Sequence, residues 1–332
     1  MRTEIIATGR YLPERVVTNA DLESRMDTSD EWIRQRTGIQ ERRWVEEGKG
    51  IGGSDLAVEA TRNACEKAGM DVSEIEMIIY CTLSPDHFFP GSGCFLQEKL
   101  GLKNVPAIDV RNQCSGFLYG LSVADAWIRT GTYRRILLVG AEVHSTGLDV
   151  STEGRDVACI FGDAAAVAIL GPTDDPDRGL LDITLGADGR HARDLWIEFP
   201  SSKNMPQFDP SVVEERRQFP SMQGQKVFKN AVVKMPRALQ EVMERQQVTP
   251  KDLRLFIPHQ ANLRISEAVQ GILGLSEDQV FNNIQKYGNT TAASIPLCLD
   301  EAVEQGRLER GELLAMASFG AGFTWGAALM RY

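Results

Sequence analysis

The feature of this 332-residue sequence that most restricts its fold is the alternation of short apolar runs with segments of helical periodicity. Apolar runs that predict buried strands occupy residues 76–82, 105–110, 135–141, 253–257 and 313–319. Helical patterns lie at 28–38, 54–69, 114–129, 227–244 and 259–271. Strands that alternate with helices favour parallel pairing with the helices packed on the sheet. The sequence therefore predicts an α/β fold.

The second half of the chain resembles the first. Each half contains Phe-Gly followed by small residues and a second apolar run, at 160–166 and at 318–324. We therefore expect two similar halves, residues 1–171 and 172–332, joined near the acidic, turn-forming stretch 171–177. The most irregular region is 186–225, and a loop of this length is more often functional or partner-covering than idle.

Composition narrows the class of protein. The net charge of −10 argues against general nucleic-acid binding. No window approaches about 20 uninterrupted apolar residues, so no membrane span is expected, and the first residues lack the apolar stretch of a signal peptide. The six cysteines form no CxxC pair. They are typical of the reduced thiols of a cytoplasmic protein.

One cysteine, Cys114, lies where a predicted strand turns into a predicted helix. The positive end of a helix dipole stabilises a thiolate and is expected to lower the pKa of a thiol there. The alternative is a buried structural cysteine, about as probable on this setting alone. The other five cysteines lack such a setting, and we interpret them as core residues.

Two further polar residues could act with this thiol. His259 follows an apolar strand at a helix start, and Asn289 lies in a Gly-Asn turn. Each also has a plain structural interpretation, as a hydrogen-bonded histidine and as a turn residue. Together with Cys114 they could supply a nucleophile, a base and an orienting group. The segment 320–322 (Gly-Ala-Gly) could present backbone N–H groups to an oxyanion.

These segments together resemble the signature segments of the β-ketoacyl-acyl-carrier-protein synthase III family. The resemblance spans essentially the whole chain, in the family's order. It implies the thiolase fold, an α/β architecture of five layers, α-β-α-β-α, built from two similar halves and usually forming a homodimer. The matching segments are 113–117 (Gln-Cys-Ser-Gly-Phe), 258–262 (Pro-His-Gln-Ala-Asn), 287–294 and 319–326, with 29–33, 36–39 and 161–163 in support.

The resemblance also implies a mechanism. Cys114 would accept the acyl group of an acyl-CoA, and His259 and Asn289 would stabilise the enolate formed when malonyl-acyl carrier protein loses carbon dioxide. The backbone N–H groups of Cys114 and Ala321 would hold the oxyanion. No metal or other cofactor is implied, because the CoA and acyl-carrier-protein thioesters are themselves the substrates.

Other positions match the family's substrate contacts. Those implied to bind the adenine and phosphates of CoA are Trp32, Arg36 and Arg155, and those implied to line the pantetheine tunnel are Gly224, Phe228 and Asn262. Phe89, or alternatively Phe88, would close the acyl pocket of the partner subunit. Lys229 and Arg264 would dock the acidic carrier protein; the alternative, which we favour less, is that both are ordinary solvated charges on a helix face.

The chain departs from the family pattern at several places. It has Arg-Asn-Gln before Cys114, Ala321 between two glycines, and Gln270–Gly271 where a basic pair is expected. These departures leave the acyl specificity open and favour a specialised member. Two alternatives remain: an acyltransferase that passes the acyl group to an alcohol or amine without decarboxylation, and a non-catalytic binding protein.

Overall fold

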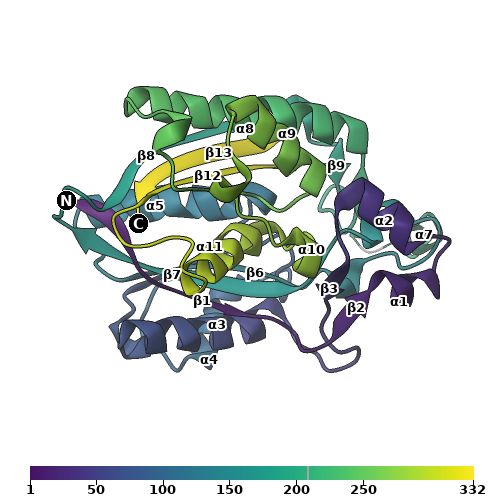
Figure 1. The fold of residues 1–332 in the computed structure, drawn as a ribbon. Coiled ribbons are helices and arrows are strands. Elements are labelled where there is room, and N and C mark those ends of the chain that lie inside the picture. Colours follow the sequence, from purple (N-terminus) through teal and green to yellow (C-terminus); the bar gives the residue numbers. More distant parts are fainter. Residues whose placement is uncertain (208) are drawn as a thin grey trace.

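Two mixed β-sheets form the frame of the protein (Figure 1), for which a computed structural model describes residues 1–207 and 209–332. The first sheet contains only strands of the N-terminal half, in the order β1 (Arg2–Tyr11), β7 (Ala164–Thr173), β6 (Ile136–Glu142), β4 (Met77–Cys81) and β5 (Ala107–Val110). The second contains only strands of the C-terminal half, in the order β11 (Leu255–Pro258), β12 (Leu313–Gly320), β13 (Thr324–Arg331) and β8 (Gly179–Ala187).

Helices complete five layers (Figure 1). Two helices lie between the sheets: α5 (Gly116–Arg129) and α11 (Ser294–Glu304). The outer face of the first sheet is covered by α3 (Gly53–Ala68) and α4 (Ser92–Lys99), and that of the second by α8 (Gly224–Arg245) and α9 (Leu263–Leu273). This is the α-β-α-β-α arrangement expected from the sequence.

Short elements gather beside the sheets, at the right of Figure 1. They are β2 (Val16–Thr18), α1 (Asn19–Glu23), α2 (Asp30–Thr37), β3 (Glu41–Arg43), α6 (Arg155–Ala158), β9 (Leu195–Trp196), α7 (Ser211–Glu214), β10 (Ser221–Met222) and α10 (Ile284–Tyr287). The region 186–225, which the sequence predicts to be irregular, therefore contains regular structure: β9 pairs with β10 in an antiparallel ribbon.

The predicted parallel pairing is confirmed for the strands that the apolar runs located, whereas the strands beside them pair antiparallel. Strand β4 is parallel to β5 and β6, and β11 is parallel to β12. The remaining pairs within the two sheets are antiparallel. The reason is clearest for β12 and β13, which are separated by only three residues, 321–323. A connection this short permits a hairpin but no crossover.

The apolar patterns of the sequence correspond to real burial. Every residue of β4 and β6 is buried, as a strand covered on both faces requires. Helix α3 packs closely on β1, where a Cβ atom at Gly9 would lie 2.3 Å from the carbonyl oxygen of Ala60. Only glycine permits this approach of helix to strand. Gly69, with φ of 62°, ends the helix as predicted.

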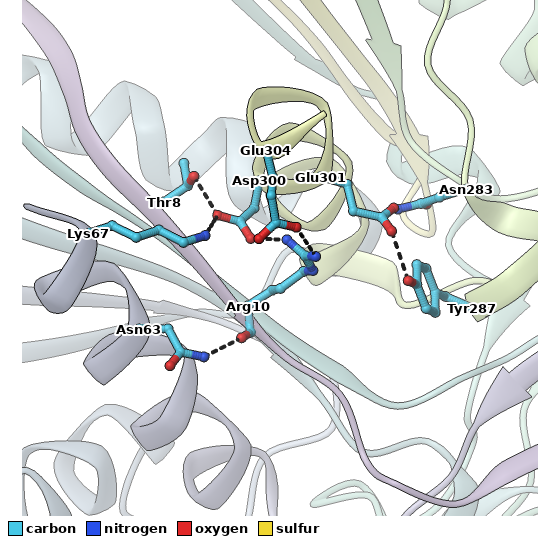
Figure 2. Close-up of polar contacts among 9 residues, drawn as sticks. All are labelled: Thr8, Arg10, Asn63, Lys67, Asn283, Tyr287, Asp300, Glu301 and Glu304. Carbon is cyan, nitrogen blue, oxygen red and sulfur yellow. Dashed lines mark hydrogen bonds and ion pairs between the residues drawn. The ribbon is translucent and has the colours of Figure 1, made fainter. Parts of the chain in front are cut away.

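An ion-pair cluster that we call the Asp300 joint connects the two halves (Figure 2). Asp300 of α11 is 1% exposed and accepts hydrogen bonds from the Thr8 hydroxyl and the Lys67 ammonium, each at 2.7 Å. Arg10 of β1 binds Asp300 and Glu304 together. Both oxygens of the buried carboxylate therefore have partners contributed by the opposite half, as a buried charge requires.

The cysteines are all free, and five of the six are buried. The exception is Cys94 of α4, which is exposed, so its interpretation as a core residue is wrong. Helix α4 packs beside β5, the edge strand of the first sheet, and only part of its surface is covered. Among the described residues, no helix is both long and apolar enough to cross a membrane.

Candidate active site

One cavity of about 710 Å³ contains Cys114, His259 and Asn289 in its wall. Cys114 lies just after the carboxyl end of β5, and His259 directly follows β11. Carboxyl ends of parallel strands are a usual location for ligand sites in α/β proteins. The two halves therefore face this cavity together, the first contributing the cysteine and the second the histidine and the asparagine.

Cys114 is fixed by a tight turn at the start of α5. The preceding residue, Gln113, has φ of 46°, a left-handed conformation that costs free energy for a residue with a side chain. Gly320 closes the other side: a Cβ atom there would lie 2.5 Å from Cβ and 2.9 Å from Sγ of Cys114. The backbone N–H groups of Cys114 and Ala321 lie close enough to the thiol to lower its pKa in part. These two donors are the pair proposed from the sequence for the oxyanion.

The predicted lowering of the thiol pKa is wrong. Burial raises the pKa of Cys114 to about 12, the carboxylate of Glu142 adds to the increase, and the two backbone N–H groups offset only part of it. Burial dominates because the thiol is only 7% exposed. The resting cysteine is therefore a neutral thiol that needs a base during attack.

His259 is 2% exposed, and burial lowers the pKa of its imidazole to about 3. Its Nδ1 lies 2.7 Å from the hydroxyl oxygen of Ser294. Its Nε2 has no hydrogen-bond partner among the described residues. A buried polar atom left open at a cavity is available for substrate.

Asn289 is oriented by its own backbone neighbourhood. Its Oδ1 accepts the N–H of Thr291 at 2.8 Å. Since only the oxygen of the amide can accept from an N–H, this contact determines which way the amide points, and Nδ2 remains a donor. The backbone of Asn289 bridges to Phe161 of the N-terminal half, with the N–H of Asn289 on the Ile160 carbonyl at 2.9 Å.

The predicted tunnel residues Gly224, Phe228 and Asn262 line the same cavity. Asn262 also joins two elements at the mouth. Its side chain donates to the carbonyl of Arg36 at 2.8 Å and caps α9 by accepting from the Arg264 N–H at 2.9 Å.

The predicted nucleotide contacts also lie together. The guanidinium of Arg36 is 4.3 Å from the centre of the Trp32 ring, and that of Arg155 is 5.3 Å from it. The partly buried indole is therefore flanked by two cations, an arrangement suited to an aromatic base that carries phosphates.

The predicted docking and dimer residues are at the surface. Lys229 and Arg264 are exposed, and the Arg264 guanidinium lies 6.0 Å from the ring centre of Phe228, at the cavity. Neither side chain pairs with a carboxylate in residues 1–207 or 209–332. Phe88 and Phe89 are 60% and 80% exposed, so neither closes the cavity of its own subunit.

Four residues of the site were missed from the sequence. His144 lines the cavity, and three others hydrogen-bond to residues of its wall: Glu142, Thr291 and Ser294. His144 is one of only four histidines in the chain, and Glu142 is a lone acid at the end of an apolar strand, so both carried a signal that could have been used. Thr291 and Ser294 belong to the segment 287–294, and nothing else in the sequence distinguishes them from other hydroxyl residues. The loop 186–225 supplies Leu195, Trp196 and Met222 to the cavity wall, in agreement with a functional role.

Comparisons with known proteins agree along the whole chain. Residues 108–189 match the family described as 3-oxoacyl-[acyl-carrier-protein (ACP)] synthase III, and residues 243–332 match its C-terminal family. The β-ketoacyl-[acyl-carrier-protein] synthase III of Aliivibrio fischeri is 41% identical over 332 residues, covering 100% of both chains. That of Caldanaerobacter subterraneus subsp. tengcongensis is 42% identical over 328 residues, covering 99% of this chain and 97% of the relative.

Solved structures give the same result. The 3-oxoacyl-[acyl-carrier-protein] synthase III of Aquifex aeolicus VF5 superimposes with a TM-score of 0.91 at 39% identity, covering 99% of this chain and 100% of the other. A priming β-ketosynthase of the R1128 polyketide pathway superimposes with a TM-score of 0.90 at 32% identity, covering 99% and 96%. The five layers and these matches define a thiolase-fold condensing enzyme. The chain belongs to the β-ketoacyl-acyl-carrier-protein synthase III family.

Proposed function

We propose that this protein catalyses a decarboxylative Claisen condensation. An acyl-CoA starter would react with malonyl-acyl carrier protein or malonyl-CoA to give a β-ketoacyl thioester, in fatty-acid initiation or a related secondary pathway. The observation that carries the proposal is the cavity in which a buried thiol faces two neutral donors, His259 and Asn289. The thiol and these donors suffice for the chemistry, so the reaction needs no cofactor beyond its thioester substrates.

In the first half-reaction Cys114 becomes acylated. The sulfur attacks the thioester carbonyl of the acyl-CoA while Nε2 of His259 takes the thiol proton. The oxyanion would form against the N–H groups of Cys114 and Ala321, which lie close to the thiol. The carbon–sulfur bond to CoA then breaks, and CoA leaves with the proton from His259. Acyl-Cys114 and a neutral histidine remain.

In the second half-reaction the malonyl thioester carbonyl accepts hydrogen bonds from His259 Nε2–H and Asn289 Nδ2. The carboxylate leaves as carbon dioxide, and its electron pair forms the enolate that the two donors stabilise. The enolate carbon attacks the acyl-Cys114 carbonyl and expels the thiolate, which then takes a proton from water. Neutral donors suit this step because both can hydrogen-bond the enolate oxygen without any proton transfer.

Ser294 gives His259 both of the roles that the mechanism requires. Its hydroxyl oxygen can accept from Nδ1–H, which leaves Nε2 as a base, or donate to Nδ1, which leaves Nε2–H as a donor. By rotating, the hydroxyl can pair with either tautomer of the imidazole, whose change of tautomer requires proton exchange with water. The carboxylate partner of many catalytic histidines can only accept.

The mouth of the cavity supports the choice of substrates. Trp32, Arg36 and Arg155 would bind the nucleotide end of CoA, with Gly224, Phe228 and Asn262 along the pantetheine. Lys229 and Arg264 would steer an acidic carrier protein to the same opening despite the net charge of −10, because docking depends on local charge.

We also propose a cytoplasmic homodimer. Strand β5 is the open edge of the first sheet, and Ile108 on this strand is 36% exposed; Phe88 and Phe89 are exposed as well. An uncovered apolar edge favours pairing with another strand, and Phe89 would then reach the partner's acyl pocket. Sedimentation of the protein should give twice the chain mass, and Ile108→Lys should give a monomer. The six free cysteines fit the reducing conditions of the cytoplasm.

We further propose that the two similar halves, residues 1–171 and 172–332, are copies of one ancestral unit.

Intact-mass analysis tests the proposal. Incubation with an acyl-CoA should add one acyl group to the wild type and none to Cys114→Ala. A second incubation with malonyl-acyl carrier protein should release carbon dioxide and yield a β-keto product. An ester or amide product without β-keto compound would instead establish the non-decarboxylating acyltransferase. Retention of Asn289 favours the condensation, because that acyltransferase would not need an enolate donor.

A further inference from the structure

We propose that His144 is a positioning residue for Asn289, acting through Thr291, and that it serves the decarboxylation step specifically. The inference rests on the proposed function, because it assigns a role within that reaction. It concerns a buried histidine that the acylation and condensation steps described above do not use.

The contacts form a chain from one half of the protein to the other. His144 Nε2 lies 2.7 Å from the hydroxyl oxygen of Thr291. The backbone N–H of the same threonine donates to Asn289 Oδ1 at 2.8 Å. Two successive hydrogen bonds thus connect the imidazole to the amide that is proposed to hold the enolate.

Thr291 needs this restraint. Its φ is 50°, a left-handed conformation that is a genuine outlier for a β-branched residue. The side chain is fully buried, so its hydroxyl has no access to solvent. Without a fixed partner for the hydroxyl, the turn could relax toward an ordinary conformation. The N–H would then rotate away from Asn289, and Nδ2 would lose its direction.

His144 is itself held firmly enough to act as the fixed partner. Its backbone N–H donates to the buried carboxylate of Asp163 at 2.7 Å, and its ring packs against Phe161 with the ring centres 4.8 Å apart. Burial lowers the pKa of the imidazole to about 3, so it remains neutral. A neutral ring can offer Thr291 either an N–H or a lone pair without adding charge near the enolate.

A second contact, from the end of β6 just before His144, supports the view that the N-terminal half positions the turn that carries Asn289. Glu142, the last residue of β6, approaches the N–H of Ala292 with Oε1 at 3.4 Å. The end of a strand in the first half therefore holds the turn 289–292 of the second half at two successive residues. A positional error of about 1 Å in a catalytic group can reduce the rate by up to about a hundredfold, so this restraint matters for Asn289.

The experiment measures the two half-reactions separately in three variants. His144→Phe keeps an aromatic ring against Phe161 and removes the ring nitrogens. Thr291→Val removes the hydroxyl, whereas Thr291→Ser keeps it and is the matched control. We expect His144→Phe and Thr291→Val to release carbon dioxide from malonyl-CoA about tenfold to a hundredfold more slowly than the wild type. Acylation of Cys114, followed by intact mass, should stay within about twofold, and Thr291→Ser should retain the wild-type decarboxylation rate.

A double variant tests whether the effect passes through Asn289. In an Asn289→Ala background, adding His144→Phe should produce no further loss of decarboxylation, because the group to be positioned is gone. A further loss equal to that of the single variant would overturn the proposal. So would decarboxylation at the wild-type rate in Thr291→Val, or an equal loss in both half-reactions. If His144→Phe does not fold, the comparison of Thr291→Val with Thr291→Ser tests the proposal by itself.

Failure of the underlying function would be seen without any of these variants. In that case the wild type itself would neither become acylated at Cys114 nor release carbon dioxide from malonyl-CoA or malonyl-acyl carrier protein. A working wild type with indifferent variants would reject only the role of His144.

Discussion

The catalytic cavity and the Asp300 joint both place buried polar groups between the two halves, and they differ in what is left unpaired. In the joint, both oxygens of Asp300 bind partners from the N-terminal half (Figure 2). At the cavity, His259 Nε2 is buried without a partner among the described residues. Full pairing is typical of a cluster that stabilises the fold. An open buried donor is tolerated where a substrate supplies the missing partner.

The comparison is tested most severely by Asn289→Ala. Loss of one enolate donor should lower the condensation rate by on the order of a hundredfold or more, while acylation of Cys114 and the thermal midpoint change little. The two half-reactions are measured by carbon dioxide release and by intact mass. An unchanged rate of carbon dioxide release would remove Asn289 from the reaction.

A substitution in the Asp300 joint should have the opposite effect: it should lower the stability of the protein and leave the reaction rate nearly unchanged. Asp300→Ala removes the carboxylate that Thr8, Arg10 and Lys67 share, and losing hydrogen bonds to a charged group costs about 1.5–3 kcal/mol of unfolding free energy. Denaturant unfolding measures this loss. At a temperature where the variant remains folded, Cys114 acylation should proceed within about twofold of the wild-type rate. A selective loss of acylation without loss of stability would contradict the division between the two regions.

Glu142 combines features of the two regions. Its carboxylate is fully hydrogen-bonded, like that of Asp300, and it also raises the pKa of the Cys114 thiol at the cavity. Burial raises its pKa from 4.5 to about 7. The folded protein therefore keeps a proton that the unfolded chain releases. The resulting stability is fully present below pH 4.5 and is lost as the pH rises to about 7, amounting to about 3 kcal/mol.

Glu142→Gln should remove this dependence. The unfolding free energy of the variant, measured in denaturant between pH 4.5 and 8, should fall less steeply with rising pH than that of the wild type. The absolute stability of the variant is not the criterion, since an amide cannot accept all the hydrogen bonds that the carboxylate accepts. Parallel pH profiles for the two proteins would show that Glu142 is ionised throughout.

The smallest effect is expected at the mouth of the cavity. Trp32→Ala removes the ring between Arg36 and Arg155 and should raise the KM for acyl-CoA about fivefold with little change in kcat, since one partly exposed stacking contact is worth about 1 kcal/mol. Steady-state kinetics with an acyl-CoA measures both constants. An acyl-pantetheine substrate without the nucleotide is the control and should react equally with both proteins. A fall in kcat alone would reject a binding role for Trp32.

Much of this architecture could be predicted from local pattern. The apolar runs located β4, β6, β11 and β12, and Cys114, His259 and Asn289 were identified by their segments. The parallel pairing of β4 with β5 and β6, and of β11 with β12, was predicted correctly. The antiparallel strands beside them were not predictable in this way, because a buried apolar run is the same whether its neighbour is parallel or antiparallel. The pKa of Cys114 was also mispredicted. A helix start is visible in sequence, whereas the burial that outweighs it depends on Gly320 and Glu142, which are remote in the chain.

The contact between His144 and Thr291 could not be predicted for a similar reason. The two residues are 147 positions apart, and their pairing depends on how the halves assemble. Local sequence indicates which groups carry reactive atoms. The groups that orient them come from whichever strand end the fold brings near.

The central claim is that a cysteine of one half and a donor pair of the other act on one substrate in one cavity. Its most direct test is a single reaction of acyl-CoA with malonyl-acyl carrier protein, followed by mass spectrometry of the protein and the product. The account predicts transient acylation of Cys114 and a β-ketoacyl product two carbons longer than the starter, with the acyl-enzyme accumulating in Asn289→Ala. A β-ketoacyl product formed at the wild-type rate by Cys114→Ala would contradict it.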